Sequence, residues 1–277
     1  MGIIDSHIHF WKYDAVRHSW INDDMAVIRR DFLPEDAKKV FEKSKIDGCV
    51  AVQADQSDQE TSFLVALAAN SAFIKGVVGW VDFTSSDLQE KLQAYSKVPF
   101  IKGFREIIQG CPDDQYFTNK KFLEGISRLS SYDYTYDILI HHHQLPSAVR
   151  FSGKYPDQDF ILDHIAKPDI KSGDWKKWKS DMKELALNPR IYCKLSGMVT
   201  EADWQRWNYD QVKPYLEIAA EYFGTGRICF GSDWPVCLLA GKYEEVLSII
   251  TEFLSQVSEN ERKQVLSGNT STFYKLN

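Results

Sequence analysis

Several features that divide or anchor a protein are missing from this sequence of 277 residues. It has no Gly/Ser-rich or Pro-rich stretch, no long block of like charge and no low-complexity tract. We also find no internal repeat with the period of about 20 to 50 residues that is typical of solenoids and propellers. Because no segment has the composition of a linker, we predict that residues 1–277 form a single domain with one large core.

Long apolar runs and an excess of positive charge are also missing. No run approaches the roughly 18 residues that a membrane span needs, and no charged region followed by an apolar one opens the chain, so we expect a cytoplasmic protein. The formal net charge is -6 and the isoelectric point is ≈ 5.7. This balance argues against nucleic acid and membranes as partners and favours a small-molecule substrate. The sequence leaves open whether the protein forms a homo-oligomer.

Cysteine pairs with metal-binding or redox spacing are absent too. The five cysteines contain no Cys-x-x-Cys and are scattered along the chain, at Cys49, Cys111, Cys193, Cys229 and Cys237. Three of them fall inside or beside apolar segments, so we predict buried, reduced thiols. A cysteine nucleophile has no support in the sequence.

What the sequence does contain is a regular alternation of β-rich and amphipathic segments. Short apolar, β-branched runs occur at 3–9, 49–54, 76–81, 101–107, 138–142, 160–165, 191–195 and 228–231. Apolar residues at helical spacing occur between them, at 34–45, 59–70, 122–130, 174–187, 209–223 and 243–257. A doubly wound sheet would more often show a Gly-rich phosphate turn after its first strand, and this chain has none. We therefore predict an α/β protein, a single (β/α)8 TIM-like barrel.

Two histidines one residue apart are the most informative local signal. His7 and His9 lie in the first predicted strand, where alternation projects both imidazoles onto one face. Near the other end of the chain, Asp233 follows the last predicted strand and precedes a Pro-containing turn. If the fold brings these strands together, imidazole and carboxylate ligands would form a site for metal-assisted hydrolysis. The alternative is two histidines that are only hydrogen-bonded at a strand end.

The carboxyl ends of the predicted strands carry the polar groups that a barrel active site needs. After His7 and His9, the strand ends in chain order supply Gln53 and Asp55, Trp80 and Asp82, Arg105 and Glu106, His141 to His143, Asp163 and His164, Lys194 and Ser196, and Asp233 and Trp234. All but one of the seven histidines occupy such positions.

These segments resemble the amidohydrolase superfamily, and more narrowly its lactonase branch, which includes L-rhamnono- and L-fuconolactonases and 2-pyrone-4,6-dicarboxylate lactonases. The likeness spans the whole chain and is carried by DSHIHFW at 5–11, GFRE at 103–106, LDHIAKP at 162–168, KLSG at 194–197, FGSDWP at 230–235 and GNT at 268–270. The resemblance implies a lactone hydrolase. This chain has a triple histidine at 141–143, where many lactonases have an arginine-containing segment. The difference puts the substrate contacts at these positions in doubt.

The resemblance implies that His7, His9, His164 and Asp233 line the catalytic centre, with Glu106 as a further metal ligand. Such ligands suit Zn²⁺ or another first-row divalent ion and leave a position for water. The family also contains metal-free members, in which the histidines polarise the carbonyl by hydrogen bonds. Glu106 has two alternatives of its own, an ion pair with Arg105 or an acceptor for a sugar hydroxyl.

Asp233 is our candidate general base, which would take a proton from the attacking water and return it to the departing ring oxygen. The alternative role for Asp233 is a cap for the following helix, and for His164 a hydrogen-bonded core position.

We predict that substrate is bound by Trp11, Trp20, Gln53, Arg105, His141, His143, Lys194 and Trp234. Tryptophans interleaved with polar side chains suit stacking and hydrogen bonding to a polyhydroxylated ring. Along a regular strand His141 and His143 would share one face and His142 the other, and a metal role for His141 is possible under this pattern. The alternative for Arg105 and Lys194 is neutralisation of nearby carboxylates.

These residues favour a hydrolase that opens an L-sugar-acid lactone of the L-fucono-, L-rhamnono- or L-galactono type. A dicarboxylated pyrone would need several cationic groups, and the strand ends supply only Arg105 and Lys194. The remaining alternatives are a metal-dependent decarboxylase of the same superfamily and a non-catalytic sugar-binding barrel. The second is disfavoured because a pure binder has little need of Asp233 beside the histidines.

Overall fold

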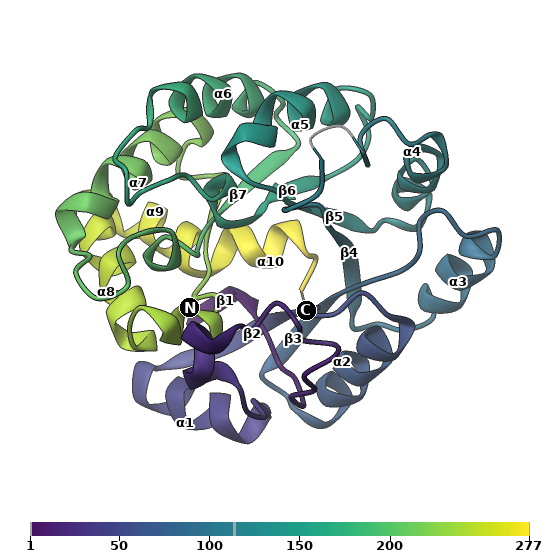
Figure 1. Cartoon of the computed structure of the whole chain (residues 1–277), viewed down its shortest axis with the longest axis horizontal. Coiled ribbons are helices and arrows are strands. Elements are labelled where there is room, and N and C mark those ends of the chain that lie inside the picture. The colour runs from purple at the N-terminus through teal and green to yellow at the C-terminus, as the bar shows by residue number, and fades with distance from the viewer. Residues whose placement is uncertain (1, 113–114, 277) are drawn as a thin grey trace.

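The computed structural model describes residues 2–112 and 115–276, and these form a barrel of parallel strands ringed by helices (Figure 1). The strands are β1 (Ile3–Ile8), β2 (Ile46–Val52), β3 (Ile74–Gly79), β4 (Ile101–Ile107), β5 (Thr135–Leu139), β6 (Phe160–Leu162), β7 (Ile191–Leu195) and β8 (Ile228–Phe230). They form one eight-stranded sheet in the order β1 to β8, with every neighbouring pair parallel. The predicted (β/α)8 architecture is confirmed.

Helices α1 to α7 lie between successive strands on the outside of the barrel, and helices α8 to α10 follow the last strand. They are α1 (Pro34–Ser44), α2 (Asp58–Asn70), α3 (Leu88–Tyr95), α4 (Lys120–Ile126), α5 (Leu145–Ser152), α6 (Lys176–Ala186), α7 (Tyr209–Phe223), α8 (Tyr243–Phe253), α9 (Glu259–Lys263) and α10 (Asn269–Phe273). Local signals set several of these bounds. Asn208 accepts a hydrogen bond from the Gln211 amide at the start of α7, which typically contributes about 1 kcal/mol, and Gly224 ends the helix with a φ of 68°.

The barrel closes between β8 and β1 through the segment that follows β8. The His9 amide donates to the Trp234 carbonyl at 2.7 Å, and the Asp233 amide donates to the His7 carbonyl at 2.9 Å. The buried Asp5 carboxylate accepts from the backbone amides of Ser232 at 2.9 Å and His7 at 3.0 Å. These bonds fix Asp233 beside the end of β1, although the two segments are far apart in the sequence.

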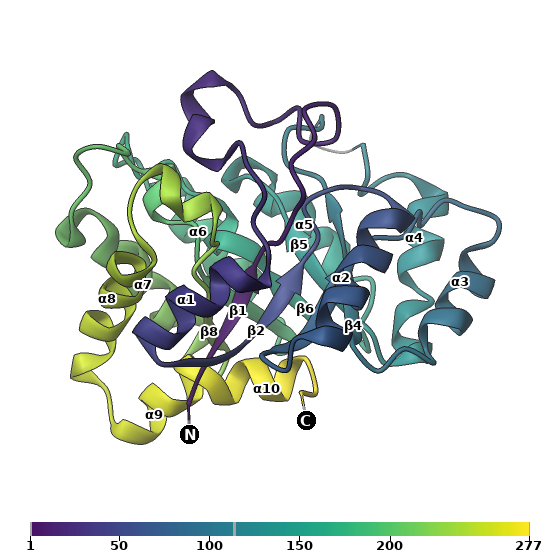
Figure 2. The same ribbon diagram turned by 90° about the horizontal axis from the view of Figure 1, so that it is seen from below.

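The interior of the barrel changes character along its axis. Its lower part is apolar and contains Val50, Val52, Val78, Ile161 and Cys229, packed against Phe273 and Tyr274. These last two residues belong to the C-terminal segment, and α10 lies across the end of the barrel where the strands begin (Figure 2). At the opposite end, residues 9–33 project as a long connection that contains the 3₁₀ helix η1 (Asp23–Ile28) (Figure 2). Polar groups therefore occupy the end at which the strands finish.

Some sequence-based boundaries are wrong. The fifth strand ends at Leu139 rather than 142, and residues 142–144 form the 3₁₀ helix η3 (His142–Gln144). The sixth strand ends at Leu162 rather than 165, because the backbone turns to positive φ at His164. The helix predicted at 122–130 is divided into α4 and the 3₁₀ helix η2 (Leu129–Tyr132), while α3, α5, α9 and α10 were not predicted.

In the part of the chain that the structure covers, no helix combines the length and the apolar character needed to cross a membrane.

Candidate active site and metal centre

His7, near the end of β1, and His9, directly after the strand, face the same point at the barrel axis. Their Nε2 atoms are 3.2 Å apart, and both side chains are buried. The Nδ1 atom of His9 lies 2.8 Å from the Val52 carbonyl, which can only accept, so this nitrogen carries the proton. In the neutral ring, the Nε2 lone pair of His9 is thus directed toward the centre of the site.

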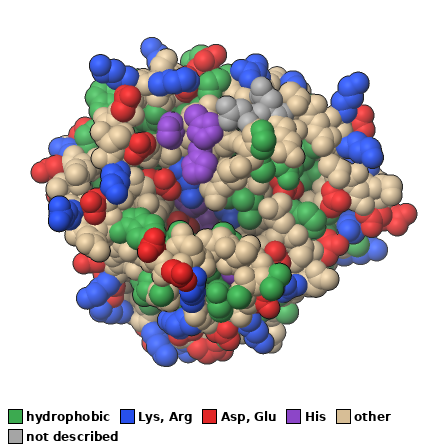
Figure 3. All heavy atoms as spheres, in the orientation of Figure 1, with side chains coloured by type: hydrophobic (Ala, Val, Ile, Leu, Met, Phe, Trp, Pro, Cys, Tyr) green, Lys and Arg blue, Asp and Glu red, His purple; other side chains and the backbone are tan. Residues whose placement is uncertain are grey.

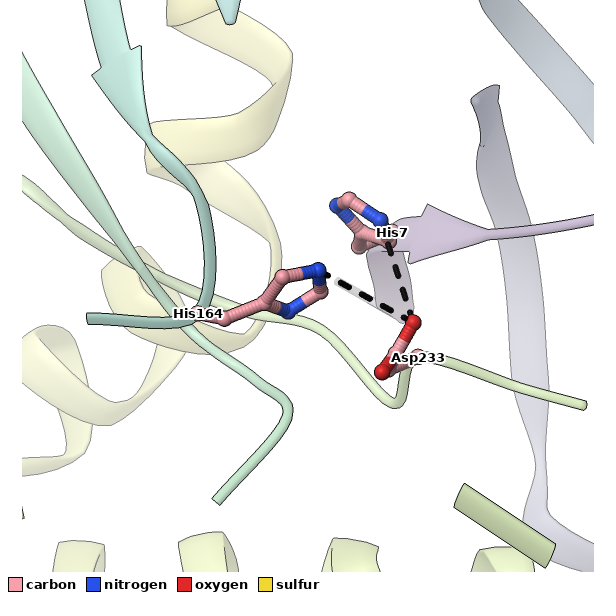
Figure 4. A group of neighbouring side chains, drawn as sticks. All are labelled: His7, His164 and Asp233. Carbon is pink, nitrogen blue, oxygen red and sulfur yellow. Dashed lines mark ion pairs between the residues drawn. The ribbon is translucent and has the colours of Figure 1, made fainter. Parts of the chain in front are cut away.

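Asp233 completes this group from the end of β8. Its Oδ1 atom lies 3.4 Å from Nε2 of His9 and 3.9 Å from Nε2 of both His7 and His164. Figure 4 shows the carboxylate directed between the rings of His7 and His164. Asp233 itself has a φ of 59°, a backbone conformation that is uncommon for residues other than glycine.

His164 is presented by an unusual backbone turn. Residues 164–167 all have positive φ, with values of 54°, 48°, 61° and 47°. Side chains around the turn hold it in place: Trp178 Nε1 donates to the Ile165 carbonyl at 2.8 Å, and Ser196 Oγ lies 2.9 Å from His164 Nδ1. Gly197 is needed beside it, because an added Cβ would lie 2.7 Å from that same nitrogen.

A buried network of charges lies beneath His7. Lys194 Nζ contacts Asp137 Oδ2 at 2.5 Å, Asp163 Oδ1 at 2.9 Å and His7 Nδ1 at 3.0 Å. Arg105 Nη1 contacts Asp163 Oδ2 at 2.9 Å and His7 Nε2 at 3.2 Å. Both cations are therefore paired with carboxylates inside the barrel, as the neutralisation alternative expects.

The protonation states of the site follow from burial and from these pairs. Burial alone would raise the pKa of Asp163, but the Lys194 ammonium holds it well below its ordinary value. Burial lowers the pKa of His164 to about 3 and that of His7 well below its ordinary range. Burial would raise the pKa of Asp233, yet His164 and His9 bring it below the usual value. At neutral pH the site combines the uncharged imidazoles of His7 and His164 with an ionised aspartate.

This donor set fits a divalent metal ion. Ligand atoms of His7, His164 and Asp233 all lie within 4.8 Å of one another, and all three residues are buried. His9 adds a fourth ligand atom, its Nε2, which lies 3.4 Å from the Asp233 oxygen. Histidine nitrogens and carboxylate oxygens are typical zinc ligands, and a catalytic zinc site uses three of them and leaves a position for water.

The structure places Glu106 away from that group. Neighbouring residues of a strand point to opposite faces, so Arg105 enters the barrel and Glu106 turns away from it. Its carboxylate accepts hydrogen bonds from Trp80 Nε1 at 3.1 Å and from the Gln56 amide. Burial raises the pKa of Glu106 to about 7. Glu106 is not among the grouped ligands of the described residues, so the predicted metal role has no geometric support.

A cavity of about 550 Å³ opens above the histidines and Asp233, and the molecule is visibly hollowed there (Figure 3). Of the predicted substrate-binding residues, Trp20 and Arg105 line it, with His9, His164 and Asp233. Four other predicted substrate-binding residues do not line the cavity and make contacts within the protein instead. Trp11 donates to the Arg30 carbonyl at 2.8 Å, Gln53 accepts from Arg105, Lys194 is held in the charge network, and Trp234 packs against Phe10 and Phe32.

The histidines at 141–143 do not enter this cavity either. Since β5 ends at Leu139, strand alternation no longer governs them, and the expected inward pair of His141 and His143 is not formed. These two rings stack on each other instead, with centroids 5.8 Å apart, and His142 Nδ1 lies 2.9 Å from the Lys167 carbonyl. The histidines seen at the surface gather beside the hollow (Figure 3).

Several cavity residues were missed from the sequence. Lys167 follows the turn that presents His164, while Thr200, Glu201 and Trp204 come from the connection after β7. Gln109 also lines the cavity, and its Oε1 has no hydrogen-bond partner among the described residues. All of these lie on loops or in a short 3₁₀ helix, which show no periodicity, so only the LDHIAKP segment, which ends one residue after Lys167, carried a usable signal.

Comparison with known proteins agrees with this geometry. The family model described as Amidohydrolase matches residues 4–276. An L-fucono-1,5-lactonase of Burkholderia multivorans is 37% identical, with 99% of this chain and 96% of the relative covered, and one of Burkholderia ambifaria is 32% identical, with 99% and 95% covered. The crystal structure of a Burkholderia multivorans amidohydrolase with bound zinc superposes with a TM-score of 0.97 at 36% identity, and both chains are covered completely.

Proposed function

The chain belongs to the amidohydrolase family, and from that premise we propose that it opens a sugar-acid lactone of the L-fucono-1,5-lactone type by hydrolysis. One observation carries the proposal: an ionised aspartate and three buried imidazoles meet at the floor of a cavity large enough for a sugar ring. The identity to L-fucono-1,5-lactonases extends over nearly the whole chain and favours this substrate class.

Asp233 acts as the general base in this proposal. Its Oδ1 takes a proton from the water that attacks the lactone carbonyl, and the same carboxyl group returns a proton to the ring oxygen as the ester bond breaks. The low pKa of Asp233 keeps the carboxylate ionised before attack. The hydrogen bonds that close the barrel hold this residue at the end of β1, where the water must be positioned.

Positive charge near the floor of the cavity stabilises the oxyanion that forms during attack. The Arg105 guanidinium lines the cavity, and hydrogen bonds to Gln53 and Asp163 fix its position. A fixed charge of this kind needs no rearrangement when negative charge develops on the carbonyl oxygen. A divalent ion held by His7, His9, His164 and Asp233 would polarise the same carbonyl and lower the pKa of the attacking water.

The proposal is tested by proton release in weak buffer from a panel of lactones. The panel contains L-fucono-, L-rhamnono-, L-galactono- and D-sugar lactones together with 2-pyrone-4,6-dicarboxylate. We expect the wild-type protein to hydrolyse an L-sugar lactone. Asp233→Asn should lose about 100-fold or more in activity, and the control Asp82→Asn should lose no activity. Asp82 also follows a strand, but it binds Thr84 and does not line the cavity.

Chelator treatment of the native protein tests the metal separately. Activity that falls on chelation and returns with zinc would support a resident ion, while unchanged activity would assign carbonyl activation to the histidines and Arg105. If the folded protein hydrolyses no lactone of the panel, the proposed lactonase function is refuted. Full activity of Asp233→Asn would refute the role of Asp233 as general base.

A further inference from the structure

An ion pair with no assigned role stands in the wall of the cavity. Lys167 and Glu201 both line it, and their side chains are 17% and 22% exposed. The Lys167 Nζ atom is 3.5 Å from Glu201 Oε1, which is longer than the roughly 2.7–2.9 Å of a well-formed charge-assisted hydrogen bond. The two groups are therefore close enough to neutralise each other but loose enough to accept a ligand between them.

The backbone fixes both residues in place. Lys167 ends the left-handed turn that begins at His164, where its amide donates to the His164 carbonyl at 2.8 Å. Its own carbonyl lies 2.9 Å from His142 Nδ1. Glu201 ends the 3₁₀ helix η5 (Val199–Glu201), and its carbonyl accepts from the Lys171 amide at 3.1 Å.

The conformational free energy that the left-handed turn costs indicates that the side-chain positions it produces are important for the site. A residue other than glycine typically loses about 1–2 kcal/mol in this conformation, and four such residues follow one another here. Backbone strain of this kind persists where the surrounding structure enforces it, and it clusters at functional sites. In this chain the turn brings two side chains into one cavity, His164 at the reacting centre and Lys167 beside it.

We propose that Lys167 and Glu201 bind two neighbouring hydroxyl groups of the substrate, so that this pair selects a polyhydroxylated lactone over an unsubstituted one. The ammonium can only donate, and the carboxylate can only accept. A vicinal diol offers one oxygen as acceptor and one hydrogen as donor side by side, which matches the pair. This inference rests on the proposed lactonase function and assigns the substrate class that the site prefers.

The pair borders the reacting centre, which places the selected hydroxyls near the lactone carbonyl. Burial raises the pKa of Glu201, Lys167 opposes this rise, and the charge of Asp233 adds to it. Lys167 in turn contributes to the low pKa of His164. Trp20 and Trp204 line the same cavity and supply aromatic surface for the ring itself.

Selection would follow from the loss of water around the pair. A ring that lacks hydroxyls would displace water from the ammonium and the carboxylate and leave them only their long contact of 3.5 Å with each other. Sites built to hydrogen-bond a hydroxyl reject analogues without it far more strongly than apolar pockets reject a missing methylene.

The experiment compares two δ-lactones, L-fucono-1,5-lactone and unsubstituted δ-valerolactone, by steady-state kinetics. Lys167→Asn removes the charge and keeps a residue that tolerates positive φ, while Glu201→Gln keeps size and shape. We expect each variant to lose about 10- to 100-fold in kcat/KM for the hydroxylated lactone, mainly through KM, and to show a clearly smaller loss for δ-valerolactone.

Lys167→Arg retains the donor and should recover part of the loss. The matched control is Lys171→Asn, since this exposed lysine touches Glu201 only through its backbone and should behave as wild type. If Lys167→Asn does not fold, Glu201→Gln decides the question.

Equal losses for both lactones would show that the pair serves the reacting centre rather than the hydroxyls and would overturn the inference, as would no loss for either. Both outcomes leave the proposed lactonase intact. A wild-type protein that hydrolyses neither these lactones nor the rest of the panel would instead remove the proposed function, and this inference with it.

Discussion

Glu60 offers a quantitative test of how burial shapes the stability of this barrel. It lies in the first turn of α2, is 4% exposed, and its Oε1 accepts from the Ala54 amide at 3.0 Å. Burial raises its pKa from 4.5 to about 7, only partly offset by that hydrogen bond. The folded protein thus holds this proton more tightly than the unfolded chain does, and stability must fall as pH rises between these two values.

The magnitude follows from the size of the shift. Each pKa unit corresponds to about 1.4 kcal/mol, so the shift from 4.5 to about 7 destabilises the folded protein by about 3 kcal/mol at about pH 8. Glu60→Gln keeps an oxygen acceptor for Ala54 and removes the ionisation. We therefore expect the variant to gain about 3 kcal/mol over wild type near pH 8 and little at pH 4.5.

Urea unfolding of both proteins across this pH range is the assay. The control is Glu35→Gln, because Glu35 occupies the first turn of α1 and is exposed, so it reports the loss of a carboxylate near a helix N-terminus without burial. A difference between Glu60→Gln and wild type that does not change with pH, or a variant less stable than wild type near pH 8, would refute the reasoning.

Three further changes probe the site and its support. Gly197→Ala should lower kcat by about 100-fold with the fold retained in circular dichroism, because the new Cβ would displace His164; unchanged kcat would contradict this. Tyr274→Phe should cost about 2 kcal/mol in urea unfolding, since its hydroxyl donates to the buried Asp137 at 2.8 Å, and a neutral result would show that another donor replaces it. Lys194→Met should destabilise by about 3 kcal/mol or more and increasingly so as pH rises, because it leaves Asp137 without its cation; equal loss at low and high pH would contradict that cause.

The regular parts of the barrel could be predicted because their signals are local. The bounds of β4, β7 and α7 agree with the predicted 101–107, 191–195 and 209–223. In each case an apolar pattern of one period runs between clear breaks, and the barrel then buries the face that the pattern marks. The short helix α10 could not be found in this way, because five residues are too few to show a helical period.

The candidate site was predictable where strands position it and not where loops do. His7 and His9 converge because alternation along β1 directs them to one side. The same rule failed for His141 and His143, because the chain leaves the strand at Leu139 and alternation no longer applies. The metal role of Glu106 came from the family resemblance and not from alternation, which places its neighbour Arg105 in the inward position.

The sequence by itself determined the barrel, the order of its strands and the inward placement of His7 and His9, since these depend on hydrophobic periodicity and on the pleat of a strand. Only the tertiary structure decided how Asp233 meets them and how Lys167 enters the cavity beside His164. Those positions depend on positive φ values that the individual residues disfavour. Contacts from distant segments stabilise this backbone, so the sequence could mark His164 and Asp233 by resemblance but could not predict the conformation that places them.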